Sequence, residues 1–210
     1  MSKNIMTFQE LTQIITAHPQ RYNRRLIAID GGGGAGKSTC ATYLQQSIQD
    51  SYIVHIDDFY RPPQLRVPVL HLDTINPNFD WDRFHTTILD ATKNNEAITY
   101  QLYDFEAGTL SGNIIEIPQR ATVIVEGVWS MQSAFVDMYD YCIWLEAPSD
   151  IRLERGVSRD GEEFRHVWER EWIPIDDSYK NTQTPHLKAQ CIIDSVRSDF
   201  QKNNIVLFSE

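Results

Sequence analysis

The sequence predicts an α/β fold, a three-layer α/β/α sandwich with a mostly parallel sheet. Short apolar runs typical of buried strands alternate with segments whose apolar residues recur at helical spacing, and this alternation is the pattern of a parallel sheet covered on both faces. The clearest strand patterns span residues 26–29, 121–125 and 141–145. The 210 residues are 41% apolar and 23% charged, which suits a single globular domain over residues 1–210.

The first third of the chain holds two helix patterns and a strand pattern. Residues 7–18 predict a leading helix, because Thr7 and Glu10 have the spacing of a capping box and Pro19 stops the apolar repeat. The strand pattern 26–29 runs directly into a glycine-rich segment, residues 30–39. A second helix is expected after it, with its apolar residues on one side: Cys40, Tyr43, Leu44 and Ile48.

The rest of the chain continues the alternation. A strand is predicted at 52–56, followed by an irregular loop that contains Pro62, Pro63 and Pro68. A helix is expected at 81–94, a hairpin from 98–105 and 113–117, and late strands near 191–193 and 205–208. Residues 149–180 predict a charged helical lid and the helix after it, with Pro174 as an interruption.

Composition limits the partners that the chain is expected to have. Lys and Arg number 19 against 29 Asp and Glu, a formal charge of −10, which argues against nucleic acid or an anionic membrane as a partner of the whole surface. No apolar run approaches the length of a membrane span, so we expect a cytoplasmic protein. The three cysteines, Cys40, Cys142 and Cys191, have no metal-site or disulfide spacing and are expected to be buried thiols.

The glycine-rich segment matches the phosphate-binding P-loop pattern Gly-x-x-x-x-Gly-Lys-Ser. In this pattern glycines let backbone N–H groups surround a polyphosphate, Lys37 meets the terminal phosphates and Ser38 holds magnesium. The strand before it and the helix after it are the structural context that the motif requires. The predicted ATP-binding residues are Gly31, Gly32, Gly33, Gly34, Ala35, Gly36, Lys37, Ser38 and Thr39.

The P-loop alone leaves the use of the triphosphate open, because switches, motors and small-molecule kinases share it. The chain lacks the Asn-Lys-x-Asp guanine reader of GTPases and the Leu-Ser-Gly-Gly-Gln signature of transporters. The strand 121–125 ends instead at Glu126, a single carboxylate that would lie beside the phosphates as a magnesium partner. The alternative for Glu126 is a solvated strand end.

A kinase also needs a carboxylate that orients the acceptor hydroxyl and takes its proton. Asp57 and Asp58 follow the predicted strand 52–56, and in an alternating strand they would point in opposite directions. Only one of them would then face the site, while the other caps or solvates the loop. Without a P-loop, both could equally be ordinary turn aspartates.

These motifs, in their order along the chain, resemble the uridine kinase family of P-loop kinases, to which nicotinamide riboside kinases and phosphoribulokinases are related. The resemblance covers about residues 26–193 and rests on Gly31 to Thr39, Asp57-Asp58-Phe59-Tyr60, Asn78-Phe79-Asp80, Tyr103-Asp104-Phe105 and Val125-Glu126-Gly127. It implies that Asp57 is the base and that Ser38, Asp57 and Glu126 surround Mg²⁺. It also implies that Asp80 holds ribose hydroxyls, while Tyr60, Tyr103 and Phe105 line the acceptor pocket. Taken alone, Tyr103 and Phe105 are more often core or hairpin residues, because aromatic residues are enriched in strands.

The predicted lid carries a row of arginines. Arg152, Arg155 and Arg159 recur at spacings of three and four, which places them on one helical face, as expected of a clamp on the phosphates. We predict catalytic roles for Arg155 and Arg159 beside Lys37 and Asp57. The alternative is a solvated face whose arginines pair with nearby acidic residues: Glu154, Asp160, Glu162 and Glu163.

The chain departs from the family's pattern in the lid and beside the expected base pocket. Gly156 replaces the second of two adjacent arginines, the following Arg-rich segment is shortened to residues 161–165, and Gly108 stands where uridine kinases carry a base-contacting His. Trp168 and Trp172, four residues apart, are expected to pack in a core.

The prediction is an ATP- and Mg²⁺-dependent kinase that phosphorylates a hydroxyl of a nucleoside such as uridine. One alternative changes the acceptor to nicotinamide riboside, pantothenate or a sugar phosphate. The other is a regulatory ATP-binding module.

Overall fold

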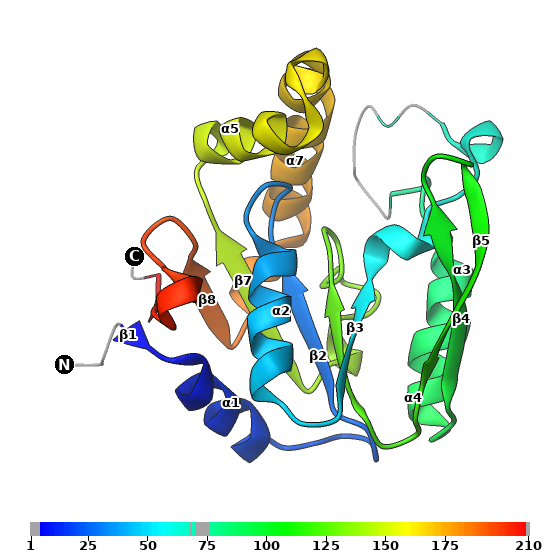
Figure 1. The fold of residues 1–210 in the computed structure, drawn as a ribbon, viewed down its shortest axis with the longest axis vertical. Coiled ribbons are helices and arrows are strands. Elements are labelled where there is room, and N and C mark those ends of the chain that lie inside the picture. The colour runs from blue at the N-terminus through cyan, green and yellow to red at the C-terminus, as the bar shows by residue number, and fades with distance from the viewer. Residues whose placement is uncertain (1–4, 68, 70–75, 209–210) are drawn as a thin grey trace.

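A five-stranded parallel sheet forms the centre of the molecule (Figure 1). The computed structural model describes residues 5–67, 69 and 76–208. The strands are β2 (Leu26–Asp30), β3 (Ser51–His55), β6 (Thr122–Glu126), β7 (Tyr141–Glu146) and β8 (Cys191–Asp194), in the order β3-β6-β2-β7-β8. All neighbours are parallel, so the carboxyl ends of the strands meet at one edge. The predicted sandwich with its parallel sheet is confirmed.

Alternation along the strands divides the core between the two faces of the sheet. Ile27 and Ile29 pack with α1 (Phe8–Ala17) and α2 (Lys37–Ser47) on one face. Leu26 and Ala28 pack into the larger cluster on the other face. The leading helix begins at the predicted capping box, because Thr7 Oγ1 accepts the Glu10 N–H and the Glu10 carboxylate accepts the Thr7 N–H. The three cysteines are buried and free, as predicted.

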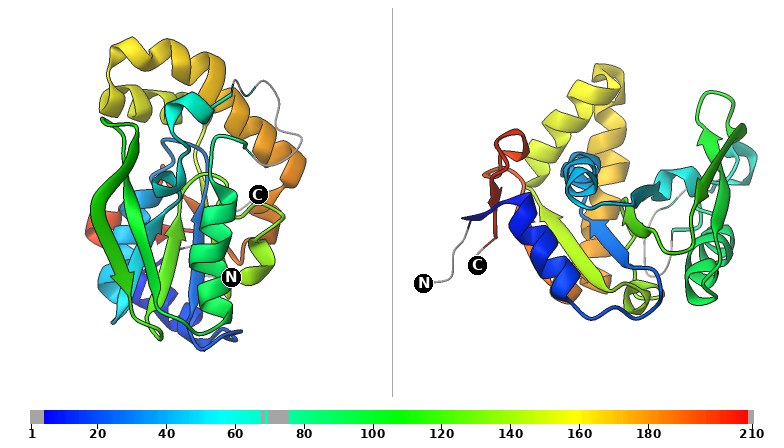
Figure 2. Two further views of the ribbon diagram at one scale, coloured as in Figure 1. Left: turned by 90° about the vertical axis from the view of Figure 1, so that its right-hand side faces the viewer. Right: turned by 60° about the horizontal axis from the view of Figure 1, so that its bottom comes forward.

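A second unit stands beside the sheet and contributes to its second face (Figure 2). This hairpin unit comprises α3 (Trp81–Phe84), a π-helical turn (His85–Asp90), α4 (Ala91–Lys93) and the antiparallel strands β4 (Ile98–Asp104) and β5 (Thr109–Ile117). Arg24, fully buried, donates hydrogen bonds to the carbonyl oxygens of Glu96 (2.9 Å) and Pro118 (2.8 Å). The side chain that precedes β2 therefore fastens the hairpin unit to the sheet.

The lid lies over the carboxyl edge of the sheet (Figure 1). It comprises α5 (Ser149–Asp160), a 3₁₀ turn (Glu162–Phe164), α6 (Arg165–Val167) and a π-helical turn (Trp168–Trp172), and it leads into α7 (Ile173–Gln183). The predicted interruption at Pro174 is wrong. Pro174 lies in the first turn of α7, directly after the π-helical turn, and at the start of a helix a missing N–H costs little.

The remaining elements are short. β1 (Ile5–Met6) pairs antiparallel with β9 (Ile205–Val206), which lies within the predicted strand 205–208. The 3₁₀ helices are η1 (Ile56–Phe59), η2 (Pro63–Leu65), η4 (Val136–Met138), η7 (Pro185–Lys188) and η8 (Phe200–Lys202). Pro68 of the predicted loop lies outside the described residues. In the part of the chain that the structure describes, no helix is both long and apolar enough to cross a bilayer.

Candidate active site

The glycine-rich loop connects β2 to α2 in a conformation that only glycine allows at several positions. Gly34 has φ +76°, and a Cβ there would lie 2.4 Å from the Arg152 carbonyl oxygen. A Cβ at Gly31 would lie 2.5 Å from the Leu145 carbonyl oxygen. Because Gly36 precedes α2 without a side-chain cap, no side chain covers the first N–H groups of the helix. The loop thus has the open backbone donors that a phosphate group needs.

Lys37 is buried at the start of α2, and its Nζ donates to the Gly32 carbonyl oxygen (3.0 Å). The side chain therefore folds back over the loop. The predicted phosphate-binding residues, 31–39, form the loop before α2 and the first turn of that helix.

Two buried aspartates hold this loop, and the sequence reasoning missed both. Asp30 accepts hydrogen bonds from the N–H groups of Gly31 (2.7 Å) and Met131 (2.9 Å) and from the Tyr179 hydroxyl (2.7 Å). Burial raises the pKa of Asp30 to about 6. An aspartate directly after a buried strand and before a glycine was the one signal available in the sequence.

Asp176 on α7 is the second of these aspartates. Its Oδ2 accepts the Gly33 N–H (2.7 Å) and lies 3.8 Å from an Arg152 nitrogen. Burial raises the pKa of Asp176 to about 6. Nothing local in the sequence marks this residue, because its partners belong to the loop and to α5.

Two of the three predicted metal ligands, Ser38 and Glu126, are in contact where the start of α2 meets the carboxyl end of β6. Ser38 Oγ donates to Glu126 Oε1 (3.0 Å), and Glu126 Oε1 lies 2.5 Å from His55 Nδ1. Burial opposes ionisation of Glu126, but its hydrogen bond with His55 and the charge of Lys37 outweigh this and lower its pKa. The hydrogen bond with Glu126 raises the pKa of His55. The sequence assigned His55 no role, because nothing local shows that β3 and β6 are neighbours.

Asp57 and Asp58 lie on η1 rather than at the end of a strand, because β3 ends at His55. The predicted opposite directions rested on strand alternation, which does not apply on a 3₁₀ helix, but the two side chains differ in burial. Asp58 is buried and accepts the Tyr103 N–H (3.3 Å), so it supports β4. The Asp57 side chain reaches solvent, although protein atoms surround it densely. Burial, followed by the negative charge of Glu126, raises the pKa of Asp57.

These oxygen donors suit a magnesium ion. Two carboxylates, Asp57 and Glu126, lie within electrostatic reach of each other beside the Ser38 hydroxyl. Magnesium in proteins takes one or two carboxylates together with phosphate oxygens and water. Among the described residues no three His, Cys, Asp or Glu side chains form a complete metal cage. The donor set therefore fits an ion that is shared with phosphate oxygens.

Two of the three lid arginines, Arg152 and Arg155, contact the loop. Arg152 is buried, donates to Asp177 Oδ1 (2.7 Å), and lies so close to Gly32 that a Cβ there would clash with its guanidinium. Arg155 donates to the carbonyl oxygens of Gly34 (3.4 Å) and Ser195 (3.1 Å).

Arg159 is the lid arginine whose charge acts on Asp57 and Glu126. It also pairs with Asp160 (2.6 Å). Of the other acidic residues that the solvated-face alternative named, Glu154 and Glu162 pair with Arg165 instead.

Gly156 departs from the family's lid pattern for a reason of packing. A Cβ at Gly156 would lie 2.3 Å from the ring of Trp168, which is 2% exposed and donates from Nε1 to Asp160 (3.1 Å). Trp168 packs in a small lid core with Val157 and Ile173, as predicted. Trp172 meets it edge-on but remains partly exposed.

The predicted acceptor residues lie next to η1. The rings of Tyr60, Phe79, Tyr103 and Phe105 form one aromatic cluster. Asp80 caps α3, because its Oδ1 accepts the Arg83 N–H (3.1 Å), and its own N–H donates to the Phe59 carbonyl oxygen (2.7 Å). The structure thus brings Tyr60, Tyr103 and Phe105 together, and it places Asp80 next to η1.

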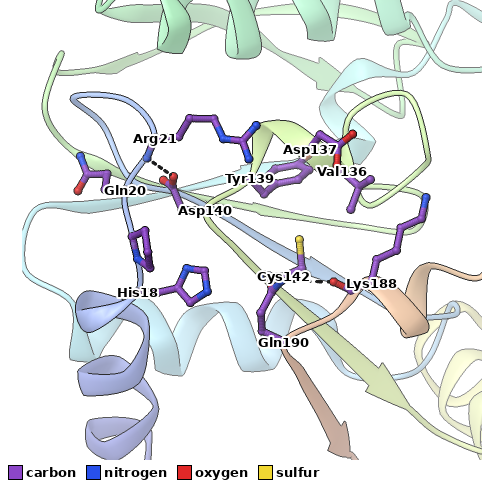
Figure 3. Close-up of a pocket in the computed structure, with 11 residues that line it drawn as sticks. His18, Gln20, Arg21, Val136, Asp137, Tyr139, Asp140, Cys142, Lys188 and Gln190 are labelled. Carbon is purple, nitrogen blue, oxygen red and sulfur yellow. Dashed lines mark hydrogen bonds between the residues drawn. The ribbon is translucent and has the colours of Figure 1, made fainter.

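The cavity drawn in Figure 3 is distant in the fold from this site. It has a volume of about 400 Å³ and lies at the amino ends of β2 and β7. Its Asp140 accepts the N–H groups of Arg21 (2.6 Å) and Leu26 (2.8 Å), and Gln190 accepts the Cys142 N–H (2.7 Å). These hydrogen bonds fix the backbone where it enters β2 and β7. A second cavity, of about 290 Å³, adjoins Gly32 between β7, α5 and α7.

Known proteins agree with this geometry. Residues 26–188 match the model of the Phosphoribulokinase / Uridine kinase family. A uridine kinase from Clostridium novyi is 31% identical over 150 residues, which cover 66% of this chain and 69% of that protein. One from Oceanobacillus iheyensis is 26% identical and covers 78% of this chain and 79% of that protein.

The fold itself recurs in a solved structure. A protein from Bacillus stearothermophilus, described as a possible uridine kinase, superposes with a TM-score of 0.69 at 19% identity, covering 88% of this chain and 96% of that one. The P-loop between β2 and α2, the parallel sheet and the family match lead to one conclusion: this chain is an ATP-dependent phosphotransferase that belongs to the Phosphoribulokinase / Uridine kinase family.

Proposed function

We propose that this chain transfers the γ-phosphate of ATP to a hydroxyl group of a small metabolite, with Asp57 as the base. The observation that carries the proposal is the position of Asp57. It lies within electrostatic reach of Lys37, Glu126 and Arg159, so the P-loop, the end of β6 and the lid converge on its carboxylate. Its raised pKa suits a group that must take a proton.

In the proposed reaction the acceptor hydroxyl gives its proton to Asp57, and its oxygen forms a bond to the γ-phosphorus. The bond from that phosphorus to the β–γ bridging oxygen breaks, and ADP leaves. Lys37 and the loop N–H groups orient the phosphates, and Arg159 offsets the charge that develops during transfer. Ser38, Asp57 and Glu126 would hold Mg²⁺, which neutralises phosphate charge when it is bound.

Two groups of acceptors fit this proposal. The uridine kinases among the relatives support a nucleoside such as uridine, whose ribose would lie near Asp80 and whose base would meet the aromatic cluster. Nicotinamide riboside, pantothenate or a sugar phosphate would use the same transfer machinery. The acidic surface, with a net charge of −10, supports a small acceptor rather than a nucleic acid.

The test compares Asp57→Asn with Asp58→Asn. The measurement is ADP release from Mg-ATP against a panel of nucleosides, sugars, sugar phosphates and pantothenate. Asp57→Asn is expected to lower acceptor-stimulated turnover by about 10²- to 10⁴-fold. Asp58→Asn is expected to lower the melting temperature while keeping turnover within about tenfold of the wild type, because Asp58 supports β4.

A regulatory ATP-binding module makes the opposite prediction. Its slow ATP turnover would not respond to any acceptor and would survive Asp57→Asn, with the variant as stable as the wild type. That pair of results would remove the proposed kinase function.

A further inference from the structure

A carboxylate of the chain already contacts the phosphate loop. The Gly32–Gly33 peptide group is held at both ends, because its carbonyl oxygen accepts a hydrogen bond from Lys37 Nζ (3.0 Å) and its N–H donates to Asp176 Oδ2 (2.7 Å). An Arg152 nitrogen lies 3.8 Å from the same carboxylate oxygen. A loop N–H and a guanidinium, two groups that commonly bind phosphate, therefore meet a carboxylate of the chain itself.

The surroundings of this carboxylate are largely dry. Asp176 is 6% exposed and comes from α7, the helix that follows the lid. The Trp168 ring covers the same part of the loop, because a Cβ at Gly33 would lie 2.9 Å from it. Little solvent reaches the carboxylate, so its charge is screened less than a charge at the surface. It therefore acts strongly on any charge that the loop binds.

The charge of Asp176 destabilises the folded chain. Burial raises the pKa of its carboxyl to about 6, although the Gly33 N–H and the charges of Lys37 and Arg152 oppose this shift. At neutral pH the folded chain therefore loses free energy by keeping the group ionised. An asparagine could accept the same N–H without that loss. Since the hydrogen bond alone does not require a charge, the charge itself points to a function.

A negative charge beside the loop weakens the binding of phosphates. Two like unit charges about 6 Å apart, two hydrogen-bond lengths, at an effective dielectric constant of about 20, repel each other enough to change a binding constant about 100-fold. Each further negative charge on a nucleotide adds to this repulsion. Weaker binding also lets ADP leave the loop faster, and product release limits turnover in many enzymes.

We propose that Asp176 is a specificity-determining residue of the nucleotide site. Its charge limits the affinity of the phosphate loop for nucleotides, and it weakens the binding of a triphosphate more than that of a diphosphate. This inference goes beyond the transfer reaction and concerns the nucleotide alone, so it depends neither on the acceptor nor on the role proposed for Asp57.

The charged groups around Asp176 set the pH range in which this effect appears. Besides the neighbouring Asp177, which pairs with Arg152, the titratable and charged groups that act on it or feel its charge are Lys37 on α2, Arg152 on α5, Asp30 on β2 and Tyr60 after η1. Lys37 and Arg152 lower the pKa of Asp176, whereas Asp30 raises it. The carboxyl is mostly protonated below about pH 5 and mostly ionised above about pH 7, so its repulsion of phosphates is expected in the upper part of this range.

Calorimetric titration with ATP and with ADP, in excess Mg²⁺ at about pH 7.5, compares the wild type with Asp176→Asn. The amide oxygen of asparagine can still accept the Gly33 N–H, so the substitution removes the charge and keeps the hydrogen bond. We expect Asp176→Asn to bind ATP at least about tenfold more tightly than the wild type, with a smaller gain for ADP. A role confined to the shape of the loop would leave the affinity unchanged or lower it.

A pH series separates the charge from the shape of the side chain. The ratio of the wild-type Kd for ATP to that of Asp176→Asn is expected to rise from near one at about pH 5 to at least about ten at about pH 7.5. The titration of the nucleotide itself is common to both proteins and cancels in this ratio. The control is Asp50→Asn, which removes one negative charge from an exposed position before β3, at the opposite edge of the sheet. Its Kd for ATP should stay within about twofold of the wild type.

The outcomes decide the role of Asp176 without measuring turnover. Melting curves show that Asp176→Asn is folded, as expected of a change that removes a buried charge. Equal or weaker ATP binding by Asp176→Asn, an equal gain for ADP, or a gain that persists at about pH 5 overturns the proposal. Absence of ATP binding by both proteins overturns it as well. None of these results bears on Asp57, which is tested by acceptor-stimulated ADP release.

Discussion

The phosphate side and the acceptor side of this molecule are built in different ways. On the phosphate side, the expected phosphate ligands are backbone N–H groups of residues 31–39. Because its glycines carry no Cβ, this loop can pack closely against the Arg152 and Leu145 carbonyl oxygens. On the acceptor side, side chains from η1, η2 and the hairpin unit meet around Tyr60. One side depends on a short local conformation, and the other depends on how separate segments pack.

This difference explains why a family can keep one side and vary the other. Every nucleoside triphosphate presents the same phosphates, so the same loop serves many reactions. Acceptors differ in charge and shape, and the side chains that meet around Tyr60 come from segments outside the loop. The lid lies between the two sides, because Arg152 contacts the loop and the charge of Arg159 reaches Asp57.

The connection between the two sides can be broken at Arg24. Arg24→Met removes two hydrogen bonds that a buried charged group donates to the carbonyl oxygens of Glu96 and Pro118. We expect a loss of about 4 kcal/mol in the free energy of unfolding, measured by urea denaturation. Amide hydrogen exchange should rise in β4 and β5 more than in β2. The control is Arg120→Met at an exposed position, which should change neither the free energy of unfolding nor the exchange rates. Uniform exchange across all three strands would contradict this role of Arg24.

A pH series sharpens the comparison on the phosphate side. The pKa of Asp176 is about 6 in the folded chain against an ordinary value of 3.8. The folded state therefore binds the Asp176 carboxyl proton more tightly than the unfolded state does. The contribution of protonated Asp176 to the free energy of unfolding is full below about pH 4 and is lost as the pH rises through about 6. Relative to Asp176→Asn, the wild type should lose up to about 3 kcal/mol of unfolding free energy between pH 4 and pH 7.

The control for this series is the neighbouring Asp177→Asn, since Asp177 is half exposed and lies outside the loop. Its difference from the wild type should not show the same slope. Parallel stability curves for wild type and Asp176→Asn would show that Asp176 does not titrate in this range.

A single methyl group tests the backbone character of the loop. Gly34→Ala adds a Cβ that would lie 2.4 Å from the Arg152 carbonyl oxygen, at a φ of +76°. Loop and lid must then move apart, and we expect ATP affinity to fall by about 10- to 100-fold. The matched control is Gly112→Ala on the hairpin, where a Cβ meets nothing within 4 Å. Wild-type ATP affinity in Gly34→Ala, measured by calorimetry, is the result that contradicts this account.

The smallest expected effect concerns the lid core. Gly156→Ala places a Cβ 2.3 Å from the Trp168 ring, and we expect a loss of about 1–2 kcal/mol in unfolding free energy. The double variant Gly156→Ala/Trp168→Leu should lose less than the sum of the two single changes, because the smaller side chain makes room. Strict additivity in thermal denaturation would show that the two positions are independent.

Local patterns in the sequence predicted much of this molecule. The capping box at Thr7 and Glu10, the P-loop at residues 31–39 and the spacing of Arg152, Arg155 and Arg159 each involve residues close in the chain. Such patterns are readable because helix geometry and glycine's conformational freedom act over a few residues. The prediction that Asp57 and Asp58 alternate at a strand end was wrong, because β3 ends at His55 and both residues lie on a 3₁₀ helix.

The contacts that escaped prediction join residues far apart in the chain. The Tyr179 hydroxyl donates to Asp30 across 149 positions, Asp176 accepts from Gly33 across 143, and His55 meets Glu126 across 71. Each depends on which strands are neighbours, and the order β3-β6-β2-β7-β8 differs from the order along the chain.

The sequence alone thus determined the α/β class, the phosphate loop, the base candidate and the lid arginines, because each follows from short-range geometry and from the chemistry of a few adjacent residues. The tertiary structure decided which charges meet. It buried Asp30 and Asp176 against the loop, placed His55 on Glu126 and seated Arg66 on Tyr60 and Tyr103. The physical reason is that burial and electrostatic interaction depend on distance in space, which packing sets and chain position does not.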